Sequence, residues 1–181
     1  MGTTTHLMTA EELILLPRGQ HRYELVKGEL LTMSPTKRKH GRIVANLTIR
    51  LGHYVLTHKL GAMYAAETGF KLASNPDTVL APDIAFIRGS VDDSSESYGE
   101  GAPDLVVEVQ SPNDRKAKVE EKAARWLALG ASMVWLIDPK RRTVEIHLSN
   151  DEPQILTEDD ELTGGDLIPG FSVRVSEIFS Y

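Results

Sequence analysis

The chain has 181 residues, of which 41% are hydrophobic and 25% are charged, and its net charge is −6. This length is typical of one domain with its own core. The absence of cysteine excludes disulfides, thiolate zinc sites, iron–sulfur clusters and a cysteine nucleophile. The longest apolar run, residues 133–137, is too short to cross a bilayer, and residues 1–12 lack a secretory signal pattern. We therefore expect a cytoplasmic protein with no membrane partner, folded as a single domain over residues 1–181.

The charge is unevenly distributed along the chain. Residues 151–161 hold six acidic residues and no basic one, and outside this segment acids and bases balance at 20 each. Two basic clusters are candidate nucleic-acid-binding residues: Lys37, Arg38, Lys39, His40 and Arg42, and Arg115, Lys116 and Lys118. They indicate a nucleic-acid surface only if the fold brings both to one face, since solvated helix starts and turns carry the same charges.

The N-terminal part predicts a short helix and a hairpin. Thr9 and Glu12 have the spacing of a capping box, and the helix should end at Pro17. Residues 22–26 alternate in hydropathy, and Lys27-Gly28 turns the chain into residues 29–33, as in a β-hairpin.

The middle of the chain predicts an α/β core. Apolar residues recur every fourth position from Ile43 to Val55, which predicts a long amphipathic helix ending near Gly61. A second helix is expected over residues 114–129, with Gly130 at its C-terminal cap. Strand-like apolar segments lie at residues 62–66, 70–73, 81–87, 105–109, 133–137 and 143–148. We expect the order helix–three strands–helix–strand, with a mixed β-sheet flanked by helices.

Two carboxylates interrupt strand-like apolar segments. Asp83 lies within residues 80–86 and Glu108 within residues 105–109. A carboxylate buried in a strand must be paired, hydrogen-bonded or metal-bound. Two that converge would bind Mg²⁺ or Mn²⁺ through oxygen; otherwise each lies on an exposed face or pairs with a Lys or Arg. No phosphate-binding glycine loop, zinc-protease motif or serine-hydrolase elbow competes with this site.

These residues carry a resemblance to a known family. Pro82-Asp83, followed after 24 intervening residues by Glu108-Val109-Gln110, resembles the PD-(D/E)XK nuclease superfamily. Seven segments in this order are similar to the Uma-type restriction endonucleases: residues 23–30 (YELVKGEL), 33–35 (MSP), His40, 81–83 (APD), 103–109 (PDLVVEV), 111–112 (SP) and 135–139 (WLIDP). The resemblance implies a restriction-endonuclease-like fold with a nuclease core over about residues 37–148. It also implies a metal-dependent endonuclease that cuts DNA and forms a homodimer.

The resemblance assigns roles to particular residues. Asp83 and Glu108 would bind Mg²⁺ or Mn²⁺. Gln110 stands where the superfamily has its lysine, and Lys122 on the following helix would replace that lysine, which stabilises negative charge at phosphorus. Glu24 would be a third acid, supporting the metal or a water.

Interpretations without a catalytic role stay open for these residues. Lys122 would then be a solvated member of the charged segment 120–122, Glu24 would lie on the hairpin surface, and His40 would be a surface histidine. In its functional role, His40 would hydrogen-bond a phosphate or a carboxylate. Two alternatives for the whole protein are a catalytically silent nuclease fold that binds nucleic acid or assembles, which Gln110 favours, and an oligomerisation domain whose carboxylates are salt-bridged.

Overall fold

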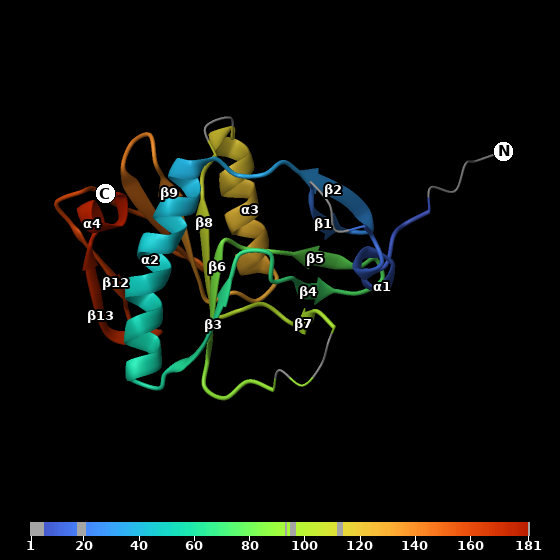
Figure 1. The fold of residues 1–181 in the computed structure, drawn as a ribbon, viewed down its shortest axis with the longest axis horizontal. Helices are drawn as coiled ribbons and strands as arrows, with labels where there is room; N and C mark the ends of the chain where they lie inside the picture. Colours follow the sequence, from blue (N-terminus) through green and yellow to red (C-terminus); the bar gives the residue numbers. More distant parts are fainter. Residues whose placement is uncertain (1–5, 18–20, 93, 95–96, 112–113, 181) are drawn as a thin grey trace.

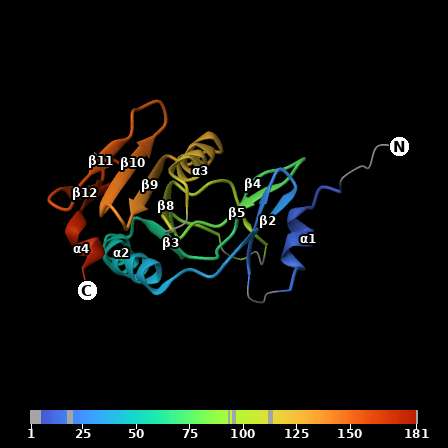
Figure 2. The same cartoon turned by 90° about the horizontal axis from the view of Figure 1, so that it is seen from above.

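The computed structural model describes residues 6–17, 21–92, 94, 97–111 and 114–180. Figures 1 and 2 show a large sheet with a helix on each face, joined to a smaller sheet at the N-terminal end of the molecule. The sheets and the two long helices together position the candidate site.

The N-terminal region forms α1 and the smaller sheet. α1 (Ala10–Ile14) starts with the expected capping box, in which Thr9 accepts from the Glu12 N–H and Glu12 accepts from the Thr9 N–H. The predicted hairpin forms, and its register pairs Leu25 with Leu30. The smaller sheet has the order β2-β1-β5-β4-β7, with bounds β2 (Glu29–Met33), β1 (Arg22–Val26), β5 (Thr78–Leu80), β4 (Phe70–Ala73) and β7 (Gly99–Glu100).

The larger sheet is mixed, because β8 and β9 pair in parallel whereas its other pairs are antiparallel. Its order is β11-β10-β9-β8-β6-β3, with bounds β11 (Gln154–Leu156), β10 (Thr143–Leu148), β9 (Met133–Asp138), β8 (Leu105–Val109), β6 (Ile84–Arg88) and β3 (Gly61–Ala65). β9 is buried on both faces, as its continuous apolar run predicts.

The two long helices cover opposite faces of the larger sheet (Figure 2). α2 (Arg38–Thr57) buries Ile43, Leu47, Leu51 and Val55, the residues whose spacing predicts it, against one face. α3 (Lys116–Ala128) packs Val119, Ala123 and Trp126 against the other face, and Gly130 follows its C-terminal cap with φ +115°.

Strand alternation decides which face each β8 side chain takes. Leu105, Val107 and Val109 join the core beneath α2, and Val106 joins the core beneath α3. Glu108 therefore points to the α3 side.

The C-terminal residues close the core next to α2. β12 (Glu161–Gly164) pairs with β13 (Ile168–Arg174), and α4 (Val175–Phe179) follows. Leu162, Ile168, Phe171, Ile178 and Phe179 pack in the core beneath α2. Within the described ranges, no helix is long and apolar enough to cross a membrane.

Two expectations about strands need correction. The 70–73 segment forms β4 in the smaller sheet, so the three strands between the helices in the larger sheet are β3, β6 and β8. Asp83 does not lie inside a strand, because β5 ends at Leu80 and β6 begins at Ile84. Pro82 has no N–H for a ladder hydrogen bond, and it separates the two strands immediately before Asp83.

Candidate active site

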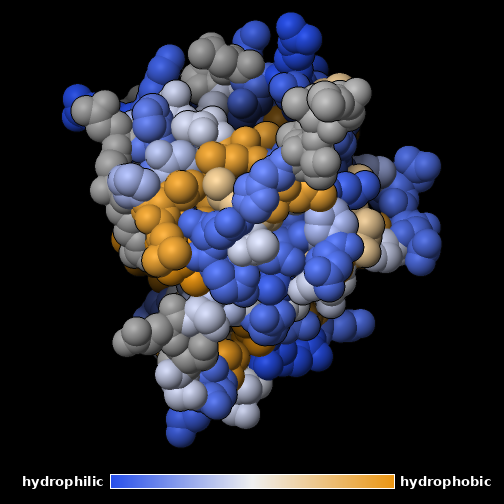
Figure 3. All heavy atoms as spheres, turned by 90° about the vertical axis from the view of Figure 1, so that its right-hand side faces the viewer, coloured by the Kyte–Doolittle hydropathy of each residue, from blue (hydrophilic) through white to orange (hydrophobic). Residues whose placement is uncertain are grey.

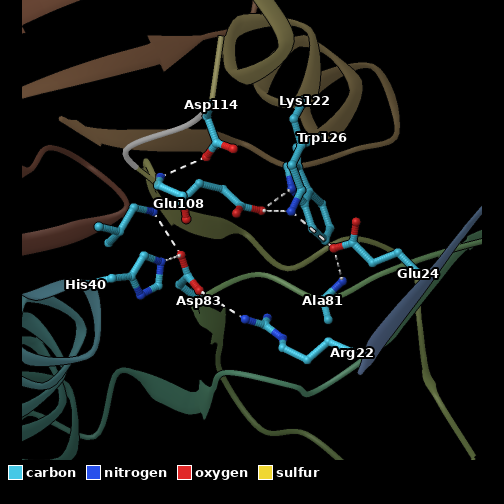
Figure 4. A network of polar contacts seen from close by, with 11 residues as sticks. Arg22, Glu24, His40, Ala81, Asp83, Glu108, Asp114, Lys122 and Trp126 are labelled. Atoms are coloured by element: carbon cyan, nitrogen blue, oxygen red, sulfur yellow. Dashed lines mark hydrogen bonds and ion pairs between the residues drawn. The ribbon is translucent and has the colours of Figure 1, made fainter. Parts of the chain in front are cut away.

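The candidate site lies where the two sheets meet α2 and α3. A cavity of about 500 Å³, called here the catalytic cavity, is lined by residues from β1, the linker before α2, the β5–β6 junction, β8 and α3. Figure 4 shows Glu24 and Glu108 pointing toward Lys122, and Asp83 pointing toward His40 and Arg22. The residues whose roles the sequence predicts and which line it are Glu24, Lys37, His40, Asp83, Glu108, Gln110, Lys118 and Lys122.

Asp83 is buried among hydrogen-bond donors. Its Oδ2 accepts from His40 Nε2 at 3.0 Å and from the Val109 N–H at 2.9 Å, and Arg22 Nη1 lies 3.7 Å from Oδ1. Burial alone raises the pKa of Asp83, but the hydrogen bond and charge of His40, the Val109 N–H and Arg22 outweigh burial and hold the pKa below its usual range. Asp83 is therefore ionised at neutral pH.

Glu108 points from β8 toward α3. Its Oε1 accepts from Lys122 Nζ at 2.9 Å and from the Trp126 indole N–H at 2.9 Å (Figure 4). Burial raises the pKa of Glu108 to about 7. Lys122 opposes this shift, and the charges of Asp83 and Glu24 add to it. Ionisation of Glu108 is thus unfavourable in the metal-free protein compared with ionisation of a solvated glutamate.

Lys122 bridges two acids from distant parts of the chain. Its Nζ lies 3.1 Å from Glu24 Oε1 and 2.9 Å from Glu108 Oε1. Burial alone lowers the pKa of Lys122, but Glu108 and Glu24 outweigh burial and raise it well above its usual range. The side chain is 24% exposed, so the interpretation of Lys122 as a solvated residue is wrong.

Glu24 reaches the site because of the alternation of β1. Tyr23 and Leu25 pack in the cluster with α1, and Glu24 takes the opposite face, as the sequence predicts. Its Oε1 also accepts from the Ala81 N–H at 3.1 Å, one residue before Pro82. Glu24 is 3% exposed, so it is not a hairpin surface residue.

His40 is likewise not a surface histidine. It lies in the first turns of α2, is 6% exposed and hydrogen-bonds Asp83. Of its two proposed hydrogen-bond partners, a phosphate or a carboxylate, the structure contains the carboxylate.

The two basic clusters approach each other at the catalytic cavity. Lys37 from the first cluster and Lys118 from the second both line it. Lys39 donates from Nζ to the Pro139 carbonyl at 2.8 Å, and Lys116 pairs with Glu120 at 3.3 Å. The remaining members of the clusters, Arg38, Arg42 and Arg115, do not line this cavity. A shared phosphate-binding surface stays a prediction for the residues at the cavity mouth.

Sequence reasoning missed the supporting roles of Arg22 and Trp126. Arg22 precedes Glu24 by two positions in a strand, so both take the same face. Trp126 follows Lys122 by four positions in a helix, so both face the sheet. These spacings are the signals that could have found them. Asp114, which accepts from the Ser111 N–H at 2.7 Å, also lines the cavity and was not predicted.

The donor set suits a hard divalent cation held partly by water. Asp83 and Glu108 supply carboxylate oxygens, and the raised pKa of Glu108 reflects in part the charge of Asp83. No group of three or more His, Asp or Glu with metal-binding geometry occurs among the residues that the structure describes. Mg²⁺ is commonly bound through one or two carboxylates, with water and substrate phosphate completing its shell. Two converging carboxylates meet this requirement.

Comparisons with known proteins agree with this architecture. The Uma2 family model, described as "Putative restriction endonuclease", matches residues 10–176. A crystal structure described as "a putative nuclease belonging to DUF820" from Anabaena variabilis is similar, with a TM-score of 0.80 and 20% sequence identity over 95% of this chain and 97% of that chain. A search of curated proteins found no match. The expected restriction-endonuclease-like fold is thereby confirmed.

Proposed function

Because the chain belongs to the Uma2 family of restriction-endonuclease-like proteins, we propose that it is an endonuclease that hydrolyses DNA with Mg²⁺ or Mn²⁺. The observation that carries the proposal is the convergence of Asp83, Glu108 and Lys122 in one cavity. Carboxylates that can hold a metal, together with a protonated amine, provide the charge stabilisation that accelerates hydrolysis of a phosphodiester.

Asp83 and Glu108 would hold the cation. When bound, it lowers the pKa of a water and neutralises charge on the phosphodiester. His40, Arg22 and the Val109 N–H keep the Asp83 carboxylate ionised and fixed in orientation. The Trp126 indole N–H donates to Glu108 Oε1 and fixes the orientation of that carboxyl group.

Lys122 would act by charge and not by proton transfer. Its raised pKa keeps the ammonium protonated, so it cannot serve as a general base near neutral pH. In the reaction a water oxygen bonds to phosphorus, one P–O ester bond breaks, and the departing oxygen gains a proton. Negative charge grows on the phosphoryl oxygens, and the Lys122 ammonium would stabilise it. Glu24 holds Lys122 in place from the other side.

We also propose that residues 1–181 work as a single domain. The site combines the core over about residues 37–148 with Arg22 and Glu24 from the hairpin, so neither part contains it alone. A single cooperative unfolding transition measured by calorimetry is expected, and two separate transitions would contradict this.

A homodimer fits the same function, since twofold symmetry presents two equivalent sites to antiparallel strands. Figure 3 shows apolar side chains on the face of α1 and β2, where Leu7, Leu15, Leu30 and Leu31 are exposed. A second copy would cover such a surface. Sedimentation equilibrium at micromolar protein should give twice the chain mass, and a mass near 20.0 kDa would contradict a dimer.

The proposal is tested by incubating the wild-type protein with plasmid and with single-stranded DNA in Mn²⁺, Mg²⁺ or EDTA. We expect cleavage with either metal and none in EDTA. The alternative, a silent nuclease fold, is favoured by Gln110 at the position of the superfamily lysine. Nucleic-acid binding without cleavage under any condition would support that alternative.

A further inference from the structure

A second cavity, called here the side cavity, adjoins the catalytic cavity. It measures about 510 Å³, and the two cavities share Arg22, His40 and Asp83 in their walls. A strand whose phosphate lies at Asp83 therefore has two cavities available for the nucleotides on either side of that phosphate.

The two cavities differ in chemistry. The catalytic cavity is lined by charged side chains such as Glu24, Glu108 and Lys122. The side cavity is lined by aliphatic side chains of α1 and by aromatic rings, among them Leu13, Ile14, Tyr23 and Tyr98.

The aromatic rings are held in place by packing. Tyr23 packs in the cluster with α1, and its ring centroid lies 6.4 Å from that of His21. The backbone at Gly69 approaches the Tyr98 ring so closely that a Cβ there would lie 2.5 Å from Tyr98 Cδ1. The side cavity thus has packed aromatic walls next to Asp83, one of the two acids proposed to hold the metal.

A nucleobase suits such a cavity. Bases stack on aromatic side chains regardless of sequence, and cavities of about 300–1,000 Å³ are typical of sites for small molecules. A surface that follows only the phosphate backbone would be strongly basic. The charged residues lining the side cavity instead have mixed signs, with Arg22 opposed by Glu67 and Asp83.

We propose that the side cavity binds the base and sugar of the nucleotide next to the phosphate that is cleaved. The proposal rests on the nuclease function above and names its substrate class. A base can enter a cavity between protein side chains only after it leaves the helical stack. The substrate is therefore DNA with an unpaired nucleotide at the cleavage point: a single strand, a gap or flap, or a duplex from which the base is flipped.

Binding without metal tests the cavity separately from catalysis. In EDTA, fluorescence anisotropy compares a short thymidine strand with a strand of abasic nucleotides of equal length and charge. We expect the wild type to bind the thymidine strand about tenfold more tightly, the effect of one stacked base. Equal affinities would overturn the proposal.

Gly41 offers a matched pair of variants. It lines the side cavity from α2, and a Cβ there meets no heavy atom within 4 Å. Gly41→Phe should occupy the cavity and remove the preference for thymidine, whereas Gly41→Ala should keep it. Tyr23→Leu, which removes the ring and keeps an apolar side chain, should reduce the preference independently. A preference unchanged in both Gly41→Phe and Tyr23→Leu would contradict the proposal.

Cleavage in Mn²⁺ separates this proposal from the one on which it rests. A single strand, and a duplex with one unpaired nucleotide, should be cut at least about tenfold faster than the perfect duplex. Cleavage of all three at equal rates would overturn the side-cavity proposal and leave the nuclease function intact. Cleavage of none would overturn the nuclease function, and the binding comparison would then decide whether the cavity takes a base.

Discussion

The surroundings of Asp83 and Glu108 differ although both carboxylates are buried at the same site. Asp83 is surrounded by donors, namely His40, Arg22 and the Val109 N–H, and its pKa is lowered. Glu108 shares Lys122 with Glu24 and faces the charge of Asp83, and its pKa rises to about 7. Burial acts in the same direction on both, so the neighbours decide the outcome. Under the proposed function, Asp83 would already be ionised as a metal ligand, and a bound cation would favour the ionised form of Glu108.

The largest expected effect is a loss of cleavage rate on removal of Lys122, which pairs with Glu108. Lys122→Ala should lower the single-turnover cleavage rate in Mn²⁺ by a factor of about 10²–10³, the usual loss when one charge-stabilising donor is removed. Gln110→Ala should lower it much less, because a neutral amide stabilises developing charge poorly. Equal rates for wild type and Lys122→Ala would show that Lys122 does not replace the missing strand lysine.

Removing the charge of Asp83 should lower the free energy of unfolding. Asp83→Asn removes a buried charge that His40 and Arg22 neutralise, and should lower the free energy of unfolding by about 1–3 kcal/mol at pH 7. The pKa of Asp83 is lowered in the folded protein, so its contribution is present above the unfolded value of 3.8 and is lost as pH falls through the folded pKa. Urea unfolding at a series of pH values measures this. An Asn variant as stable as wild type at pH 7 would contradict it.

Ionisation of Glu108 should lower the stability of the metal-free protein, whereas ionisation of Asp83 raises it. Since folding raises the pKa of Glu108 from 4.5 to about 7, metal-free stability should decrease as pH rises through this interval, with a slope of at most about 1.4 kcal/mol per pH unit from this residue. Glu108→Gln cannot ionise and should remove that part of the slope. Unfolding in EDTA between pH 4.5 and pH 8 tests it, and an unchanged slope would refute the assignment to Glu108.

The smallest expected change in stability is that of a control substitution on α3, the helix that carries Lys122. Glu120 pairs with Lys116 at 3.3 Å on the exposed face of α3. Glu120→Gln should change the free energy of unfolding by at most about 0.5 kcal/mol, because exposed pairs four residues apart contribute little. A loss as large as that of Asp83→Asn would mean that burial is not what distinguishes the site pairs.

The fold was predictable where patterns are long. The four-residue spacing from Ile43 to Val55 predicts α2, and the apolar run from Met133 predicts β9. The 70–73 segment has four residues and no information about its partners, so its place in the smaller sheet was not predictable. Pro82, which has no N–H for a ladder hydrogen bond, is the signal in the sequence for the strand break before Asp83.

The sequence points to several residues of the candidate site one at a time, but not to Arg22 or Trp126, and not to the contacts among them. Asp83 and Glu108 stand out because charge interrupts apolar runs, and the family resemblance points to Glu24 and Lys122. The contact between Lys122 and Glu24 spans 98 positions in the sequence, and local patterns carry no information about such a pair. The sequence likewise gives no sign that the side cavity adjoins Asp83.

The most direct test of the account is calorimetric titration of the protein with Mn²⁺. The wild type should bind the ion, with Asp83 and Glu108 as its protein ligands. Asp83→Ala and Glu108→Ala should each abolish binding, while Gln110→Ala should bind as the wild type does. Circular dichroism of each variant establishes that it is folded. Unchanged affinity for Mn²⁺ in either folded alanine variant would contradict the assignment of these two acids as metal ligands.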